Sequence, residues 1–506
     1  MTLDVQKGLD LLISLLPETI LSVWAMLLLL DAAWHHRDPR AQRRTGWLSL
    51  VGVAAAFGAT VWLWSSGARV EGMATSVAVD GFRWAVDLIV LLGTALVVVM
   101  SVDYLEREGI GIPEYHVLVL FAAVGMMLLA GGEDLFVMFL GLELMSISVY
   151  VLAGIARKSP ASAEAALKYF LLGAFASAFL LYGIALLYGA TGSTKLGLIG
   201  FQIRSLSLGG HAMVLGGVAL LLVGFAFKVA AVPFHMWTPD VYDGAPTPIT
   251  AYMAASVKAA AFAALVRVLL RAVPELQGSW DQVLWWLAAI TMVVGNLVAL
   301  AQRRLKRMLA YSSIAHAGYL LTALVGGSMV GAAAFLFYLL FYTLMTFGAF
   351  AVLSYKGRDG ERDVTVEDLA GLGETHPWLA LLMAICLLSL LGFPGTAGFI
   401  GKWYILVAAT GAGYSILAAV LVLTSVVSAG YYLPVIMAMY MKPRLHAEAH
   451  AGISVPRAMR VALAAVAVAL VLFGVWPSGV MQAARSGSHS FVPDRVVPIS
   501  PGTAPQ

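Results

Sequence analysis

Cysteine and charged residues are both scarce in this chain of 506 residues, and each scarcity excludes a class of protein. The single cysteine, Cys386, excludes an intrachain disulfide, a zinc–thiolate site and a cysteine-ligated iron–sulfur cluster carried by this chain alone. Charged residues make up 12% of the sequence, against about 25% in soluble domains. Together with 61% hydrophobic residues, this composition predicts a polytopic membrane protein and gives no indication of nucleic-acid binding.

Motifs that bind nucleotides or redox cofactors are also missing from the sequence. There is no phosphate-binding loop of the Walker type, no flavin fingerprint and no set of cluster ligands. We therefore expect no cofactor in this chain, and any redox centres should lie on other polypeptides. The first hydrophobic segment has no basic leader and contains Pro17 and Glu18, so we expect it to be retained and not removed as a signal peptide.

Apolar windows of about 20 residues, the length that crosses a ~30 Å hydrocarbon core, recur along nearly the whole chain. They predict an all-α fold with about fourteen transmembrane helices, at residues 11–32, 46–65, 82–104, 115–131, 134–155, 163–189, 211–242, 247–271, 281–301, 307–326, 330–354, 377–410, 413–440 and 458–476. No soluble domain fits between these spans. The tail after Trp476, rich in Ser, Pro and Gly, is predicted to be a disordered extension.

The seventh and twelfth spans are interrupted by proline. Pro233 follows Lys228 in the seventh span, and Pro394 precedes Lys402 in the twelfth. Because proline lacks a backbone donor and its ring clashes with the carbonyl four residues earlier, both helices should unwind locally. Broken helices in corresponding positions of two halves predict an inverted-repeat transporter, and these two spans cross in opposite directions, as such a repeat requires.

This symmetry suggests a division of the chain into four parts. We expect N-terminal helices 1–3 in residues 1–110, a first five-helix repeat (helices 4–8) in 111–275, an inverted second repeat (helices 9–13) in 276–445, and a last helix with a disordered tail in 446–506. Basic residues are unevenly distributed, with eighteen in the odd-numbered loops and six in the even-numbered loops. Since Lys and Arg accumulate on the cytoplasmic side, both termini are expected on the outer side of the membrane.

Five ionisable residues inside the predicted spans are candidates for a proton path: Glu143, Lys168, Lys228, Lys258 and Lys402. An ionisable side chain near the bilayer centre costs several kcal/mol unless it is paired or hydrated, so its presence is a functional hypothesis. At ~1.5 Å rise per residue, Glu143 lies ~14 Å from a helix start near Asp134, and Lys258 lies ~15 Å beyond Pro248. Lys168 is only about two turns inside its span, where it could extend to the cytoplasmic surface.

The chemistry of a lysine–glutamate pair could move protons. Burial disfavours the charged form of lysine and a nearby carboxylate favours it, so separating Lys228 from Glu143 and restoring the contact would change the lysine's proton affinity. Lys258 and Lys402 could continue the path, with His235 and His316 as relays, because imidazole gains and loses protons near neutral pH. The alternatives are structural ion pairs that hold helices together and histidines that serve only in packing.

Four further acids have no such motif. Glu18 and Asp87 lie in predicted spans and are expected to hydrogen-bond between helices or to contact a neighbouring subunit. Asp240 and Asp243 are expected in a cytoplasmic loop. We also expect Thr247 to be the N-cap of the eighth span, with Pro248 in its first turn.

Four segments of the sequence resemble the antiporter-like subunits of respiratory complex I, the proton-pumping NADH:quinone oxidoreductase. They are residues 139–154, 227–248, 305–319 and 392–402, within a similarity that extends from about 115 to 440. The chain is most similar to the N-type subunits, because Lys402 stands where the M type has glutamate and the long lateral helix of the L type is missing. Pro394-Gly395 replaces the more usual Pro-Pro of the broken helix, which leaves the break intact.

The resemblance implies a role for each candidate residue. Glu143 and Lys228 would form a modulating ion pair, Lys258 would be the central proton carrier, and Lys402 would gate the exit toward the outer side. Lys168 matches a lysine of the family's sixth helix.

The resemblance also implies the setting in which the chain works. It would be a non-redox, proton-translocating subunit in a bacterial inner membrane, coupled to electron transfer from NADH to quinone. NADH, FMN, iron–sulfur clusters and quinone would bind partner subunits, and the neighbours would include an M-type subunit and small membrane subunits. Two other hypotheses are a subunit of a multi-subunit cation/proton antiporter, which a glutamate at the position of Lys402 would favour, and a non-transporting membrane scaffold, which would leave the deep lysines unexplained.

Overall fold

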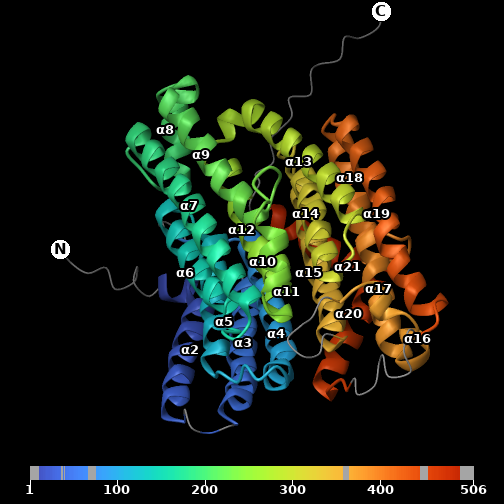
Figure 1. Ribbon diagram of the computed structural model, residues 1–506. Helices are drawn as coiled ribbons and strands as arrows, with labels where there is room; N and C mark the ends of the chain where they lie inside the picture. The colour runs from blue at the N-terminus through green and yellow to red at the C-terminus, as the bar shows by residue number, and fades with distance from the viewer. Residues whose placement is uncertain are drawn as a thin grey trace, which may run out of the picture.

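A computed structural model describes residues 11–35, 38, 40–66, 76–356, 364–444 and 454–489 of the chain. Throughout these residues the regular structure is helical, and extended pairing is limited to isolated β-bridges. Figure 1 shows the helices standing side by side, with the early helices α2–α7 on one side, α17–α19 on the other, and α12, α14 and α15 between them.

The first part of the chain supplies eight predicted spans. These are α2 (Leu16–Trp34), α3 (Ala41–Ser66), α4 (Gly81–Arg107), α5 (Glu114–Gly131), α6 (Leu135–Ala153), α7 (Pro160–Thr191), α9 (Ala212–Val229) with α10 (Thr238–Gly244), and a composite helix of α11 (Thr247–Tyr252), η2 (Met253–Val257), α12 (Lys258–Arg267) and η3 (Val268–Ala272). The η2 and η3 segments are π-helical turns. The loop before α9 contains α8 (Leu196–Ser205) and η1 (Leu208–Gly210).

The second part supplies the other six predicted spans. Its elements are η4 (Pro274–Leu276), α13 (Gln277–Leu300), α14 (Leu305–Leu324), α15 (Met329–Lys356), η5 (Glu367–Leu369), α16 (Leu372–Thr375), α17 (Pro377–Leu391), α18 (Ala397–Gly411), α19 (Ser415–Met441), α20 (Arg457–Val475) and α21 (Ser478–His489). Each predicted span therefore coincides with a single or composite helix or, for the seventh and twelfth spans, with a pair of helices, α9 with α10 and α17 with α18.

The predicted all-α polytopic fold is confirmed. Among the described residues, 12 helices are long and apolar enough to cross a membrane. The two predicted spans outside that set are the twelfth, which is divided into two short helices, and α14, which carries Lys306, Arg307 and His316. The protein is thus a multi-pass membrane protein with one unusually polar helix.

Both predicted helix breaks are present. The α9 helix ends at Val229, four residues before Pro233, which is where the proline ring would clash with a helical carbonyl. The α17 helix ends at Leu391, shortly before Pro394. The residues that follow, Ala230 at φ +61° and Gly392 at φ +86°, turn the backbone into the left-handed region and terminate the helices.

The helices at the centre of the fold are enclosed by protein. In the most apolar stretch of each helix, 94% of the residues are buried in α15 and in the composite helix from Thr247 to Ala272. The share is 28% in α20 and 33% in α2. The polar α14 is also buried along most of its length. Ionisable residues on these central helices are therefore surrounded by other helices and not by lipid.

Three predictions about local structure are wrong. The segment from Ser478 to His489 is not disordered but forms α21, which packs on α4 and α15 with Met481, Ala484 and Ser488 buried, a helical spacing that the Ser/Gly-rich composition conceals. The rest of that tail, 490–506, lies outside the described residues. Asp240 and Asp243 lie in the short helix α10 and not in a loop. The cap of the eighth span is Pro246, and Thr247 is its first helical residue.

Candidate functional site

Lys228 lies in the last turn of α9, just before the break, with 1% of its surface exposed. Its ammonium group donates hydrogen bonds to the hydroxyls of Ser146, at 2.9 Å, and Tyr150, at 3.2 Å, both on α6. The rings of Tyr150, Tyr169 and Phe227 lie 5.3–5.9 Å from Nζ. The buried cation is therefore held by two hydroxyls and three aromatic faces.

Glu143 lies on the same face of α6 as Ser146 and Tyr150 but does not contact Lys228 directly. No ion pair joins the two among the described contacts, and Oε1 of Glu143 is buried without a hydrogen-bond partner. The carboxylate still acts on Lys228 electrostatically over a longer distance. The modulating ion pair between Glu143 and Lys228 stays a prediction, because in this structure the hydroxyl of Ser146, one turn further along α6, accepts the lysine's hydrogen bond.

Lys258 is the first residue of α12 and is 1% exposed. Its Nζ donates to the backbone carbonyl of Ser313 at 3.0 Å and to the hydroxyl of Ser313 at 2.6 Å. The hydroxyl of Tyr342 in turn donates to that of Ser313 at 2.8 Å. The π-helical turn η2 immediately precedes Lys258, and π-helical turns inside helices are frequent at functional sites.

His316 lies in a cluster of hydroxyl groups on the buried helix α14. Its Nδ1 is 2.6 Å from the hydroxyl of Tyr338, and its Nε2 is 3.3 Å from the hydroxyl of Tyr432. Tyr432 also forms a hydrogen bond with Ser312. Both Lys258 and Lys402 act electrostatically on His316, and the relay role of the imidazole stays a prediction.

Lys402 lies in α18, just after the second break, and is 6% exposed. Its Nζ donates to the carbonyls of Leu390, at 3.0 Å, and Leu391, at 2.9 Å. These carbonyls belong to the end of α17 and have no helical partner because the helix stops there. The ring of Tyr319 lies 4.5 Å from the ammonium group. The break in the helix thus supplies the ligands of the lysine.

Two of the predicted residues lie apart from this row. Lys168 is at the surface, with 39% of its side chain exposed, and pairs with Glu164 at 2.7 Å and Asp240 at 2.8 Å. Its position agrees with the shallow depth estimated from the sequence. His235 is half-buried between α9 and α10, where its Nδ1 has no hydrogen-bond partner and Lys258 acts on it electrostatically.

The hydroxyl groups beside the charged residues are not among the residues predicted from the sequence. On α6, Ser146 and Tyr150 follow Glu143 at three and seven residues, a spacing that keeps all three on one helix face. On α14, Ser313 precedes His316 by three residues in the same way. The signal was therefore present as polar residues at helical spacing from the ionisable residues.

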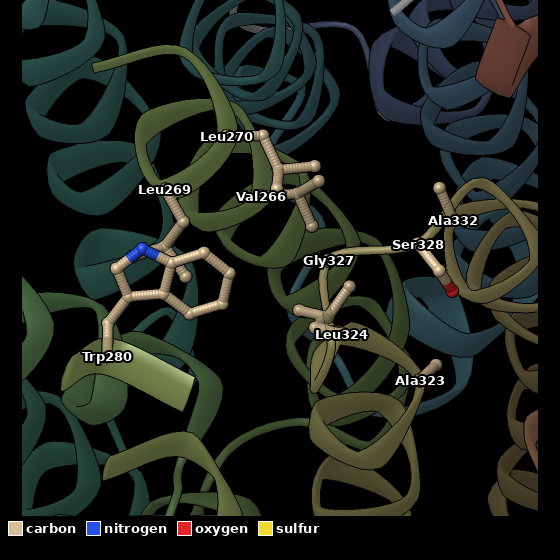
Figure 2. A pocket seen from close by; sticks show the side chains of 9 residues that line it. All are labelled: Val266, Leu269, Leu270, Trp280, Ala323, Leu324, Gly327, Ser328 and Ala332. Atoms are coloured by element: carbon tan, nitrogen blue, oxygen red, sulfur yellow. The ribbon is translucent and has the colours of Figure 1, made fainter. Parts of the chain in front are cut away.

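Clustered metal ligands are absent from the part of the chain that the structure describes. No group of three or more His, Cys, Asp or Glu residues could hold a metal ion there. A crevice between η3, α13, α14 and α15 has a volume of about 10 Å³, space for about one water molecule (Figure 2). Its lining is mainly hydrocarbon, and the indole nitrogen of Trp280 already donates to the carbonyl of Val273.

Comparisons with known proteins agree with this geometry. Residues 132–428 match the family described as NADH:quinone oxidoreductase/Mrp antiporter, TM. The NADH-quinone oxidoreductase subunit N of Gemmatimonas aurantiaca is 50% identical over 97% of this chain and 96% of that protein. The protein of the same name from Trichlorobacter lovleyi is 48% identical over 93% of this chain and 96% of its own length.

Solved structures show the same fold. A chain of respiratory complex I from Thermus thermophilus with bound aureothin superimposes with a TM-score of 0.77 at 41% identity, covering 93% of this chain and all of that one. A chain of the Mrp complex from Dietzia shares the fold with a TM-score of 0.82 at 22% identity. The buried lysines, the two broken helices and these similarities lead to one conclusion: the chain belongs to the NADH:quinone oxidoreductase/Mrp antiporter family and, within it, to the subunit N group.

Proposed function

We propose that this chain translocates protons across the membrane as a membrane-arm subunit of an NADH:quinone oxidoreductase. The observation that carries the proposal is the row of three buried lysines, Lys228, Lys258 and Lys402, with hydroxyl and imidazole groups packed beside them. Three buried cations are costly to retain for stability alone, because each loses its hydration without a carboxylate in direct contact. Reversible binding of protons explains why they are lysines and not arginines.

The groups beside each lysine can pass protons from one to the next. A hydroxyl both accepts and donates hydrogen bonds, so Ser146 and Tyr150 can serve Lys228 as an ammonium ion or as a neutral amine. Near Lys258, Ser313 plays the same part. His316 can take up a proton on one ring nitrogen and release one from the other, which makes it a relay between Lys258 and Lys402.

The driving reaction belongs to partner subunits. Since the close relatives are named NADH-quinone oxidoreductase subunit N, we infer that this chain assembles with the other subunits of that complex, including an M-type neighbour and small membrane subunits. NADH, FMN, iron–sulfur clusters and quinone would bind those partners, and electron transfer between them would drive the proton movement. The location would be a bacterial inner membrane, with both termini on the outer side as the basic loops indicate.

A substitution at the centre of the row tests this proposal. In the assembled complex reconstituted into liposomes, Lys258→Met should reduce proton translocation through this chain on the order of 100-fold, the scale typical of a lost proton-transfer group. The measurement is the number of protons moved per NADH oxidised. The matched control is Lys442→Met, which changes an exposed lysine beyond the end of α19 and should pump normally. Normal pumping by an assembled Lys258→Met complex would favour the scaffold hypothesis.

A cation/proton antiporter subunit is the second candidate function. The shared fold with a chain of the Mrp complex, and the family's description, favour it. A native gel of the tagged assembly, stained for NADH-dependent dye reduction, separates the two. An active band of several hundred kilodaltons supports the oxidoreductase, whereas an assembly without that activity but with sodium-dependent transport supports the antiporter.

A further inference from the structure

A buried cluster of charged residues lies outside the lysine row, in the N-terminal helices that precede the matched region 132–428. It consists of Glu18 on α2 with Arg83 and Asp87 on α4, and we call it the acid–arginine cluster. Exposure is 3% for Glu18 and zero for Arg83 and Asp87. Arg83 lies in the first turn of α4 with its guanidinium inside the protein.

Arg83 has partners on several elements. One guanidinium nitrogen, Nη2, donates to Oε1 of Glu18 at 2.6 Å, and Nη1 donates to the backbone carbonyl of Ala78 at 2.6 Å. The remaining nitrogen, Nε, lies 3.3 Å from Oδ2 of Asp87 but makes no hydrogen bond. The α5 helix closes the cluster at Gly131, where an added Cβ would lie 2.6 Å from Nε of Arg83.

The cluster contains one more acid than it can neutralise. Glu18 and Asp87 share the single guanidinium of Arg83. Arg267 also acts electrostatically on Asp87. It is itself ion-paired with Asp80 at 2.7 Å and with Glu133 at 2.8 Å. Glu133 also has Arg271 at 3.9 Å. The combined group therefore has four carboxyls for three guanidiniums.

Asp80, which caps α4 just outside the membrane span, is ionised. Burial by itself would raise the pKa of its carboxyl, but the guanidinium of Arg267 and the backbone N–H of Arg83 outweigh burial and hold that pKa below its ordinary value. Arg267 is thus committed to Asp80 and cannot balance the second acid of the acid–arginine cluster. A buried carboxylate without its own counter-charge is costly, and such a group is neutralised by binding a proton.

The contacts identify which acid carries that proton. Glu18 receives a short charge-assisted hydrogen bond from the guanidinium of Arg83. Asp87 is fully buried, and neither of its oxygens accepts a hydrogen bond. We propose that Asp87 is a proton-binding site, holding a proton as a neutral carboxylic acid in the outer half of the N-terminal helices.

The site lies on a polar face of α4 that leads toward the lysine row. Thr94, seven residues after Asp87, lies with its hydroxyl 2.9 Å from that of Tyr252, and Tyr252 belongs to the composite helix that carries Lys258. Seven residues is close to two helical turns, so Asp87 and Thr94 share one face. The proposal itself rests only on the contacts of Asp87 and holds whether or not the lysine row translocates protons.

Infrared spectroscopy of the assembled complex tests the proposal. A protonated carboxyl has a C=O stretching band, distinct from the bands of a carboxylate, that shifts in D₂O. Asp87→Asn should remove one such band, and Glu18→Gln should also remove it, because Arg83 is then left with Asp87 alone and the proton is released. The matched control is Asp103→Asn, which changes a partly exposed acid on the same helix, beside Arg43, and should leave the band unchanged.

Isotope labelling of the unsubstituted protein adds a first measurement that does not depend on how the variants fold. Aspartate isotopically labelled at its side-chain carboxyl carbon should shift the protonated-carboxyl band, and the label combined with Asp87→Asn should remove that shift. Persistence of every protonated-carboxyl band in Asp87→Asn, or a spectrum in which the label moves only carboxylate bands, would overturn the proposal.

Discussion

The two broken helices share a proline-induced break but present their lysines in opposite ways. Lys228 precedes its break, in the last turn of α9, and binds side-chain hydroxyls from the neighbouring helix α6. Lys402 follows its break, in α18, and binds the carbonyls at the end of α17. In the first half the ligands come from another helix, and in the second half they come from the broken helix itself.

This difference sets the three lysines apart by the kind of hydrogen-bond partner that each one has. A carbonyl oxygen only accepts hydrogen bonds, so two carbonyls favour the ammonium form of Lys402, whereas the two hydroxyls near Lys228 can also donate to a neutral amine. Lys258 is intermediate, with one carbonyl and one hydroxyl, both from Ser313. The hydrogen-bond partners therefore change from hydroxyls at Lys228 to carbonyls at Lys402.

Arginine at either end of the row should give the largest effect. Lys402→Arg and Lys228→Arg keep the positive charge, but a guanidinium does not release its proton, so translocation should fall on the order of 100-fold for each. The carbonyl site suits a permanent cation, and Lys402→Arg should therefore assemble better than Lys228→Arg. Proton-to-electron ratios in liposomes and the yield of intact complex measure the two properties. Equal yields of the two variants would contradict the inference that the carbonyl site of Lys402 suits a permanent cation better than the hydroxyl site of Lys228.

Removal of the hydroxyls near Lys228 should give the next largest effect. Hydrogen bonds to charged groups contribute roughly 1.5–3 kcal/mol each, so Ser146→Ala combined with Tyr150→Phe should slow proton translocation at least ~10-fold. Single-turnover proton release provides the measurement. Ser148→Ala is the matched control, because that hydroxyl lies on the same helix and bonds to the carbonyl of Leu144. A double variant as fast as the control would show that the hydroxyls do not take part.

Gly392→Ala should weaken the second break moderately. Gly392 has φ +86°, and a Cβ there would lie 3.0 Å from Cδ of Lys402. The strained backbone should lower the stability of the assembled subunit by about 1–2 kcal/mol and displace the lysine from its carbonyls. Thermal unfolding of the detergent-solubilised complex measures the loss, with Gly411→Ala as a control where a Cβ meets open space. An unchanged transition in Gly392→Ala would contradict the close packing of this break.

Ala230→Gly should give the smallest effect, in the opposite direction. Ala230 already occupies the left-handed region at φ +61°, so glycine relieves strain, but it also loses more chain entropy on folding. We expect a gain of no more than about 1 kcal/mol in the same thermal measurement. A marked loss of stability would show that the methyl group of Ala230 is essential to the packing of the first break.

Much of the fold could be predicted because lipid imposes strong constraints on a sequence. The spans follow from apolar length, and the breaks at Pro233 and Pro394 follow from covalent geometry. The depth of Glu143 and Lys258 follows from the regular rise of a helix, and Asp134 does cap α6 through a hydrogen bond to the backbone of Phe136. The division of the chain into repeats at 110, 275 and 445 stays a prediction.

The partners of the ionisable residues could not be predicted in the same way. Depth along a helix does not determine which neighbour a long side chain reaches, and Lys228 donates to Ser146 and Tyr150, which share a face of α6 with its predicted partner Glu143. A lysine side chain is also long enough for its ammonium group to lie in a different environment from its Cα, and that of Lys168 reaches Asp240 at the surface. Hydropathy does not detect amphipathic helices of low mean hydropathy. For that reason the sequence predicts a disordered tail where the structure has α21.

The polarity of α14 has a consequence for how the protein is made. A helix that carries Lys306, Arg307 and His316, and that falls outside the apolar spans, is poorly suited to enter lipid as a separate segment. Several of its polar groups have partners on other parts of the chain, including Ala245 before it, Tyr338 on α15 and Tyr432 on α19. We therefore expect insertion of α14 to be coupled to the assembly of its neighbours, because lipid offers no partner to Lys306, Arg307 or His316.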